Sequence, residues 1–261
     1  MLSIKNGLRE FIRKRRLGSY QFRYYRDLLV RPNYAYLVLQ AARLAWRLKM
    51  PRVSILEFGV AGGAGLTALE EHAAEVERLV PVKIEIYGFD TGAGLPPPED
   101  YRDLPYHWKA GFFKMDFTAL QRRLKRAKLV IGDVRSTAQS FFKEHDPAPI
   151  GAVSHDMDYY SSTWAALGIF DADPTRFLPR VFCYFDDVIG GEVELYNDFI
   201  GQRLAIHDFN AKHEKIKLSP IYYLRSLERS APWHRQMWSA HFFDHPEYSR
   251  FVSAENQQLP I

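Results

Sequence analysis

The chain has 261 residues, of which 47% are hydrophobic and 25% are charged, as expected for one globular α/β domain with an additional segment. The single cysteine, Cys183, excludes a disulfide framework and favours a buried thiol in a reducing compartment. No apolar run is long enough to cross a bilayer, and the N-terminus lacks the apolar core of a secretion signal. We therefore expect a cytoplasmic protein.

The first 50 residues predict a helical extension that precedes the main domain, residues 51–261, with an interruption at Arg31-Pro32. Apolar residues in its first turns alternate with a run of cations: Arg9, Arg13, Lys14, Arg15 and Arg16. Nucleic acid, an acidic membrane surface or another subunit would suit this amphipathic segment, but charge runs are usually solvated faces. We expect no nucleic-acid or membrane partner, and a homo-oligomer supported by the apolar positions.

The segment Val53–Gly65 (VSILEFGVAGGAG) predicts a buried parallel strand that ends in an acid and breaks into a glycine loop before a helix at Leu66–Leu79. Nucleotide-like ligands bind at such strand, turn and helix junctions. A carboxylate there suits a cationic or hydroxyl-rich ligand, which favours a nucleoside such as S-adenosylmethionine. A glycine-rich turn without a ligand is the alternative. The predicted cofactor-binding residues in this segment are Glu57, Gly59, Gly62 and Gly63.

The next two predicted strands bring further carboxylates to the same edge of the sheet. Asp90 ends the strand Ile84–Asp90, where its carboxylate can accept hydrogen bonds from ribose hydroxyls. Asp133 lies at the end of the strand Ala127–Val134 and is expected to contact an adenine ring and its amino group. A turn or helix-cap role is the alternative for each aspartate. The loop Thr91–Phe113, rich in glycine, proline and aromatic residues, is expected to form a lid or substrate wall.

Four carboxylates lie at the ends of the two remaining parallel strands, Ile150–Met157 and Arg180–Val188. Adjacent parallel strands bring their carboxyl ends together, and so many like charges would resist ionisation unless a cation were present. A hard divalent ion such as Mg²⁺ prefers these oxygen ligands. Helix caps and solvated strand ends are the alternative. The predicted metal ligands are Asp156, Asp186 and Asp187, with Asp158 close by as a base.

The alternation of strands and helices predicts a doubly wound, mostly parallel α/β sheet. From Ile216 onward, two alternating segments (KIKLSPIYYL and HRQMWSAHFF) predict a closing antiparallel pair. A parallel sheet closed by an antiparallel C-terminal hairpin is the Rossmann-like plan of class I S-adenosylmethionine-dependent methyltransferases, which have seven strands. We expect this fold, with the helical N-terminal extension added to it.

Five segments together resemble the macrocin O-methyltransferase family, which methylates deoxysugars of macrolide and aminocoumarin antibiotics. They occur in the order of the family and span about Ser54–Phe209: EFGVAGGAG, GFDTGAGLP, HDMDYYSST, YFDDV and LAIHDF. The resemblance implies that Glu57, Gly59 and Asp90 hold S-adenosylmethionine. It also implies that Asp156, Asp186 and Asp187 bind the metal and that Asp158 is the general base.

The predicted function is therefore S-adenosylmethionine- and divalent-metal-dependent O-methylation of a small hydroxylated acceptor, a sugar or another natural product. A metal that chelates two acceptor oxygens would lower the pKa of the hydroxyl to be methylated, and Asp158 would take the proton. The alkoxide would then attack the sulfonium methyl. Three histidines are competing candidates for the base: His107, His155 and His207.

Two other classes of function remain open. An NAD(P)-dependent oxidoreductase would also use a glycine loop, and Gly63–Ala68 (GAGLTA) is a loose match to its GxGxxA fingerprint. The match begins several residues beyond the strand, whereas the fingerprint needs its first glycine in the tight turn. The third class is a non-catalytic scaffold that binds S-adenosylmethionine. The presence of all four aspartates argues against this class.

Overall fold

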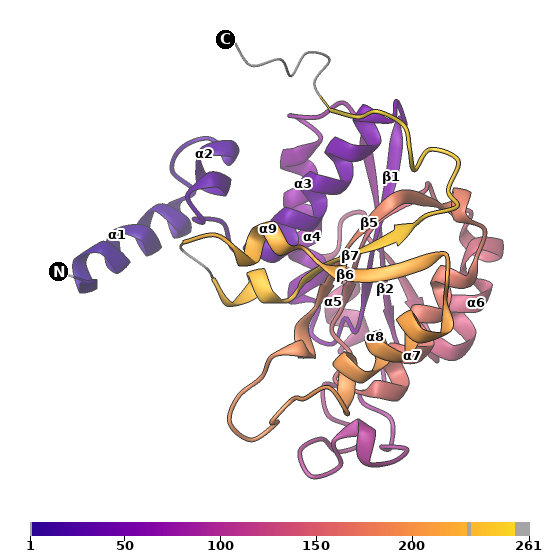
Figure 1. Ribbon diagram of the computed structural model, residues 1–261. Helices are drawn as coiled ribbons and strands as arrows, with labels where there is room; N and C mark the ends of the chain where they lie inside the picture. The colour runs from indigo at the N-terminus through magenta and orange to yellow at the C-terminus, as the bar shows by residue number, and fades with distance from the viewer. Residues whose placement is uncertain (1, 229–230, 254–261) are drawn as a thin grey trace.

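The computed structural model describes residues 2–228 and 231–253, whose strands form one seven-stranded sheet in the order β3-β2-β1-β4-β5-β7-β6 (Figure 1). Strands β1 to β5 pair in parallel, and β7 runs antiparallel to both of its neighbours, β5 and β6. This arrangement confirms the predicted mostly parallel sheet with its antiparallel closing pair. The strands are β1 (Arg52–Phe58), β2 (Lys83–Asp90), β3 (Lys128–Ile131), β4 (Ile150–His155), β5 (Phe177–Phe185), β6 (Ile216–Pro220) and β7 (Met237–Phe242).

Helices cover both faces of the sheet, because successive strand residues point to opposite sides and both sets are apolar. The side chains of Val53 and Ile55 pack with α3 and α4, whereas Leu56 and Phe58 pack with α6, α7 and α8. The helices are α1 (Leu2–Arg15), α2 (Tyr20–Tyr25), α3 (Pro32–Arg47), α4 (Ala64–Val76), α5 (Phe117–Arg123), α6 (Val134–His145), α7 (Tyr160–Leu167), α8 (Gly201–Lys212) and α9 (Tyr222–Arg225). None of the helices within the described ranges is both long and apolar enough to cross a membrane.

Several strand boundaries differ from those expected, for local reasons. Strand β1 ends at Phe58 because Gly59 adopts a φ of +84°, and β3 ends at Ile131 because Gly132 turns the chain at a φ of +149°. Strand β5 begins earlier than expected, at Phe177, because Phe177 and Leu178 are also buried. The antiparallel strands β6 and β7 are joined by residues 221–236, which include α9, rather than by a tight turn.

The N-terminal segment contains one helix that belongs to the core and one that lies apart from it. Helix α3 packs on the sheet beside α4, and its Tyr34, Leu37 and Val38 are fully buried. Arg31-Pro32 marks the start of α3, with proline at the first helical position, where its missing N–H costs nothing. Helix α1 extends away from the sheet (Figure 1).

A histidine on α4 fixes the connection between α2 and α3. The ring nitrogens of His72 lie 3.2 Å from the hydroxyl of Tyr20 and 2.9 Å from the carbonyl oxygen of Val30. Because His72 is buried, desolvation lowers its pKa from the ordinary 6.5 to about 4. The native state therefore holds this imidazole in its neutral form.

This burial predicts a pH-dependent contribution to stability. The unfolded chain protonates His72 below about pH 6.5 and the native chain only near pH 4, so this contribution is lost as the pH falls through that window. The loss reaches roughly 3 kcal/mol, at about 1.4 kcal/mol per pKa unit. We expect the free energy of unfolding of His72→Gln to fall less than that of the wild type between pH 6.5 and 4, in urea titrations. Equal falls in both proteins would contradict the neutral, buried histidine.

Candidate functional site

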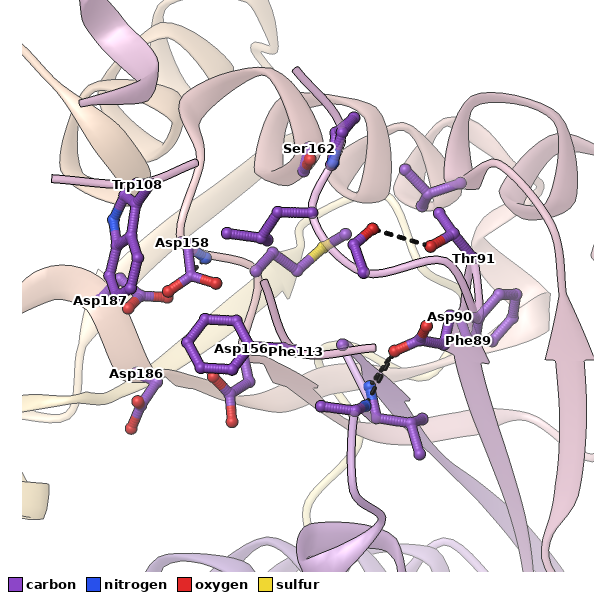
Figure 2. A pocket seen from close by; sticks show the side chains of 18 of the residues that line it. Phe89, Asp90, Thr91, Trp108, Phe113, Asp156, Asp158, Ser162, Asp186 and Asp187 are labelled. Carbon is purple, nitrogen blue, oxygen red and sulfur yellow. Dashed lines mark hydrogen bonds between the residues drawn. The ribbon is translucent and has the colours of Figure 1, made fainter. Parts of the chain in front are cut away.

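A cavity of about 870 Å³ opens at the carboxyl ends of the parallel strands (Figure 2). Ligands of open α/β sheets bind at this edge, because the loops that follow the strands surround it. All but one of the residues predicted for the site line this cavity: Glu57, Gly59, Gly62, Asp90, Asp133, Asp156, Asp158, Asp186 and Asp187. The exception is Gly63.

The glycine loop between β1 and α4 is shaped by close approaches of its backbone. A Cβ atom on Gly59 would lie 1.7 Å from the carbonyl oxygen of Asp156, so this glycine lets β1 and β4 meet at their ends. Gly63 precedes α4 in a left-handed conformation, and a Cβ atom there would lie 2.1 Å from a methyl group of Leu120. Gly63 therefore packs away from the cavity, and its contribution is to the turn. A Cβ atom on Gly62 would meet nothing within 4 Å.

Glu57 is a buried carboxylate with one oxygen free. Its Oε1 accepts a hydrogen bond of 2.7 Å from the hydroxyl of Tyr34, while its Oε2 has no partner. A Cβ atom on Gly65 would lie 1.9 Å from Oε1, so α4 can pass this close only with glycine at that position. Burial raises the pKa of Glu57 to about 8. A cationic group in the cavity would stabilise the ionised form, because it would pair with the free oxygen.

Asp90 connects the end of β2 to the glycine loop. Its Oδ2 accepts hydrogen bonds from the backbone N–H groups of Val60 and Ala61, at 2.9 and 2.8 Å, and its Oδ1 accepts one of 2.6 Å from Gly92. Both lone pairs of Oδ2 are used in this way, whereas Oδ1 has one further lone pair available. Asp90 therefore holds the loop in place and still offers an acceptor to a hydroxyl group of a ligand.

Asp133 caps α6 while lining the cavity. Its carboxylate accepts a hydrogen bond of 2.9 Å from the backbone N–H of Arg135, and both of its oxygens accept bonds from the Arg135 guanidinium. The guanidinium also lies 3.4 Å from Glu99. The helix-cap role considered from the sequence is thus present, alongside the exposure of Asp133 to the cavity.

The other end of the cavity holds four aspartates, because the adjacent parallel strands β4 and β5 both end there. Asp158 has a φ of +59°, and its backbone N–H donates a bond of 2.9 Å to Oδ2 of Asp187. Figure 2 shows these two carboxylates side by side. Gln202 of α8 secures both strand ends, since it accepts a bond from the Asp187 N–H and donates one to the carbonyl of His155.

Burial and mutual repulsion hold protons on these groups. They raise the pKa of Asp158 to about 8 and that of Asp187 to about 7, and they raise the pKa of Asp156 as well. In the part of the chain that the structure describes, no three His, Cys, Asp or Glu side chains converge closely enough to hold a metal ion. Asp186 instead bonds to Tyr184 and Gln236, and Asp187 bonds to Tyr196.

The three histidines considered as bases do not line the cavity. His155 is stacked between Phe58 and Phe185, its ring nitrogens have no partner, and burial lowers its pKa to about 3. His107 lies on the loop after β2, with its Nε2 3.6 Å from Glu194, and His207 is exposed on α8. Asp158 is therefore better placed than any of them to exchange a proton with a ligand.

Two loops meet over the aspartate end of the cavity. The predicted wall after β2 contributes Trp108 and Phe113, and residues 190–200 after β5 contribute Glu194 and Tyr196. The Tyr106 hydroxyl donates a bond of 2.6 Å to the carbonyl of Glu194, which joins the loops. The second loop, Tyr34 and Gln202 were not predicted from the sequence, because no motif or spacing links these residues to the strand ends.

The comparisons concern the fold. No protein-family model and no curated protein matches the chain. The solved structure of CalS11, described as a calicheamicin methyltransferase, is 22% identical, with 83% of this chain and 82% of that chain covered and a TM-score of 0.53. The O-methyltransferase NovP is 13% identical, with 80% and 79% covered and a TM-score of 0.53.

The fold is that of a class I methyltransferase. At these identities the likeness does not extend to the narrower macrocin O-methyltransferase family, which stays a prediction. The glycine loop lies toward one end of the cavity and the carboxylates of Asp158, Asp186 and Asp187 toward the other, within one continuous space.

The packing around Glu57 predicts that two glycine variants differ in their free energy of unfolding. We expect Gly65→Ala to lower the free energy of unfolding by about 1–3 kcal/mol, because the added methyl group overlaps Glu57 and Tyr34. Gly62→Ala is the matched control, since its methyl group would enter open space. Urea denaturation measures both. A similar effect of the two substitutions would contradict the close contact between α4 and Glu57.

Proposed function

We propose that this protein is an S-adenosylmethionine-dependent O-methyltransferase that acts on a hydroxyl group of a small molecule, a sugar or another natural product. The supporting observation is that one cavity joins a glycine loop and a buried, half-free Glu57 to a buried aspartate that can serve as a base. The fold is consistent with this activity, and the names of both similar structures describe methyltransferases.

The cofactor would lie at the glycine-loop end of the cavity. Gly59 and Gly62 line this end, where Gly62 leaves the backbone open to the nucleoside, and Asp90 would offer the remaining lone pair of its Oδ1 to the ribose hydroxyls. Asp133 would contact the adenine, and Glu57 would pair with positive charge on the cofactor. Gly63 supports the site through the turn that begins α4.

Asp156, Asp186 and Asp187 would hold a divalent cation such as Mg²⁺ at the opposite end. The three carboxylates are hard oxygen donors, the ligand type that this ion prefers. A cation between them would also offset the repulsion among their negative charges. Their side chains must leave present partners such as Tyr184 and Tyr196 to converge on one ion. When bound, the ion would supply positive charge that makes an acceptor hydroxyl more acidic.

Asp158 would take the proton of the acceptor hydroxyl. Burial and the neighbouring Asp187 and Asp186 make its carboxylate more basic than an exposed one, which suits a general base at neutral pH. The acceptor oxygen then bonds to the methyl carbon as the bond from that carbon to sulfur breaks. The products are a methyl ether and the neutral thioether S-adenosylhomocysteine, and Asp158 releases its proton to water. Alignment of oxygen, carbon and sulfur by the cavity walls supplies much of the acceleration.

Cofactor binding is the first test of this proposal. We expect S-adenosylhomocysteine, but not NAD, to bind the wild-type protein in calorimetric titrations. We also expect a heat of Mg²⁺ binding that is lost in the Asp186→Asn, Asp187→Asn double variant, because two of three ligands lose their charge. Binding of NAD alone would favour the oxidoreductase alternative. Absence of a heat of Mg²⁺ binding in the wild type would contradict the metal site without affecting the proposal for the cofactor site.

Loss of the base is the second test. With an acceptor found by screening hydroxylated sugars and polyketides, we expect Asp158→Asn to lower kcat by about 10²–10⁴-fold, the usual contribution of a general base. Its affinity for S-adenosylhomocysteine should stay within about twofold of the wild type. His207→Asn, an exposed change on α8, is the control and should leave kcat unaltered. Full activity of Asp158→Asn would refute its assignment as the base, and absence of turnover with tight cofactor binding would favour the scaffold alternative.

A further inference from the structure

The cavity is strongly acidic and contains one cation that is not already paired. Among the described residues that line it, nine are aspartate or glutamate and two are arginine, Arg31 and Arg135. Arg135 forms ion pairs with Asp133 and Glu99. Arg31 has no carboxylate within ion-pair distance in the described part of the chain; its guanidinium lies over the ring of Tyr34, 5.3 Å from the ring centre. A guanidinium with this setting is available to an anionic group of a ligand.

The backbone presents Arg31 to the cavity in a constrained conformation. Its φ and ψ of 48° and 65° are left-handed, a region that residues other than glycine seldom adopt. The preceding carbonyl, of Val30, is held by His72, and the following Pro32 begins α3. The carbonyl of Arg31 itself accepts bonds from Tyr34 and Ala35. Unfavourable backbone conformations of this kind concentrate where a side chain must reach a ligand.

Tyr34 contacts both a positive group, the guanidinium of Arg31, and a negative group, the carboxylate of Glu57. Its ring contacts the guanidinium of Arg31, and its hydroxyl donates a bond of 2.7 Å to Oε1 of Glu57. Glu57 is buried, lines the same cavity and has no partner for Oε2. One cation and one half-free anion therefore face the glycine-loop end of the cavity together. A ligand that carries a carboxylate and an ammonium group on one carbon, which is an α-amino acid, complements both.

We infer that Arg31 binds the carboxylate of the amino-acid tail of S-adenosylmethionine while Oε2 of Glu57 accepts from its ammonium group. This inference rests on the proposed function and extends it, because Arg31 lies outside the glycine loop, in the segment between α2 and α3. It assigns the recognition of the tail carboxylate to the N-terminal part of the chain, and that of the ammonium group and the nucleoside to the sheet edge.

The test uses three ligands whose tails differ, and for each ligand the affinity of a variant is compared with that of the wild type. S-adenosylhomocysteine carries the complete amino-acid group, 5′-methylthioadenosine lacks it, and decarboxylated S-adenosylmethionine keeps the amine without the carboxylate. We expect Arg31→Ala to weaken the binding of S-adenosylhomocysteine by about 10- to 100-fold, the range for a charged hydrogen bond. The other two ligands should bind within about twofold of their wild-type affinities. Glu57→Gln should instead weaken both ligands that carry the amine.

Two further variants distinguish a loss of ligand binding from a loss of folding. Arg31→Gly suits the left-handed backbone and removes the same cation, so it should reproduce the effect of Arg31→Ala even if the latter unfolds. Arg31→Lys keeps the charge and should restore part of the affinity for S-adenosylhomocysteine. Thermal unfolding of each variant reports on its integrity.

The outcomes separate the inference from the function on which it rests. If the wild-type protein binds neither S-adenosylhomocysteine nor 5′-methylthioadenosine, the proposed cofactor is wrong. If it binds both, and the Arg31 variants weaken the two ligands equally, Arg31 only supports the fold and the inference fails. Unaltered affinity of Arg31→Gly for S-adenosylhomocysteine also overturns the inference, with the proposed function intact.

Discussion

Buried negative charge at one edge of the sheet is the constraint on which the rest of the structure depends. Parallel strands β4 and β5 end side by side, so Asp156, Asp158 and Asp187 are brought together by the topology itself. Burial makes their ionised forms costly, and the surrounding fold offers hydrogen bonds rather than cations as compensation. Under the proposed function, the positive charge of a bound ligand would offset this cost.

Contacts from the neighbouring strands hold the aspartates in a fixed position relative to the glycine loop. Asp90 binds the loop from β2, and Gly59 lets the end of β1 lie against the carbonyl of Asp156 on β4. These contacts are made by backbone groups and short side chains, which have few alternative conformations. The two ends of the cavity therefore belong to one rigid edge, and the distance between them is set by the spacing of the strands.

The sequence predicted the elements whose signal is local. The apolar runs ending in Glu57, Asp90 and Asp156 identified three strands and the edge at which their carboxylates meet, because burial and glycine turns are visible in residue type. Side-chain direction was not predictable in this way. Whether Asp186 points at a metal or at Tyr184, and whether Gly63 faces the cavity or Leu120, depends on residues distant in sequence. Arg31 was interpreted only as a helix interruption for the same reason.

The contact between Tyr106 and Glu194 has a consequence for how this protein can diverge. Both residues lie in connections that follow strands and contribute nothing to the sheet, yet the two connections line the aspartate end of the cavity through Trp108, Phe113, Glu194 and Tyr196. Insertions or deletions in either connection change the width of that enclosure at little cost to the core. Under the proposed function, such changes would alter acceptor choice without disturbing the glycine-loop end of the cavity, which is built on strands β1 and β2.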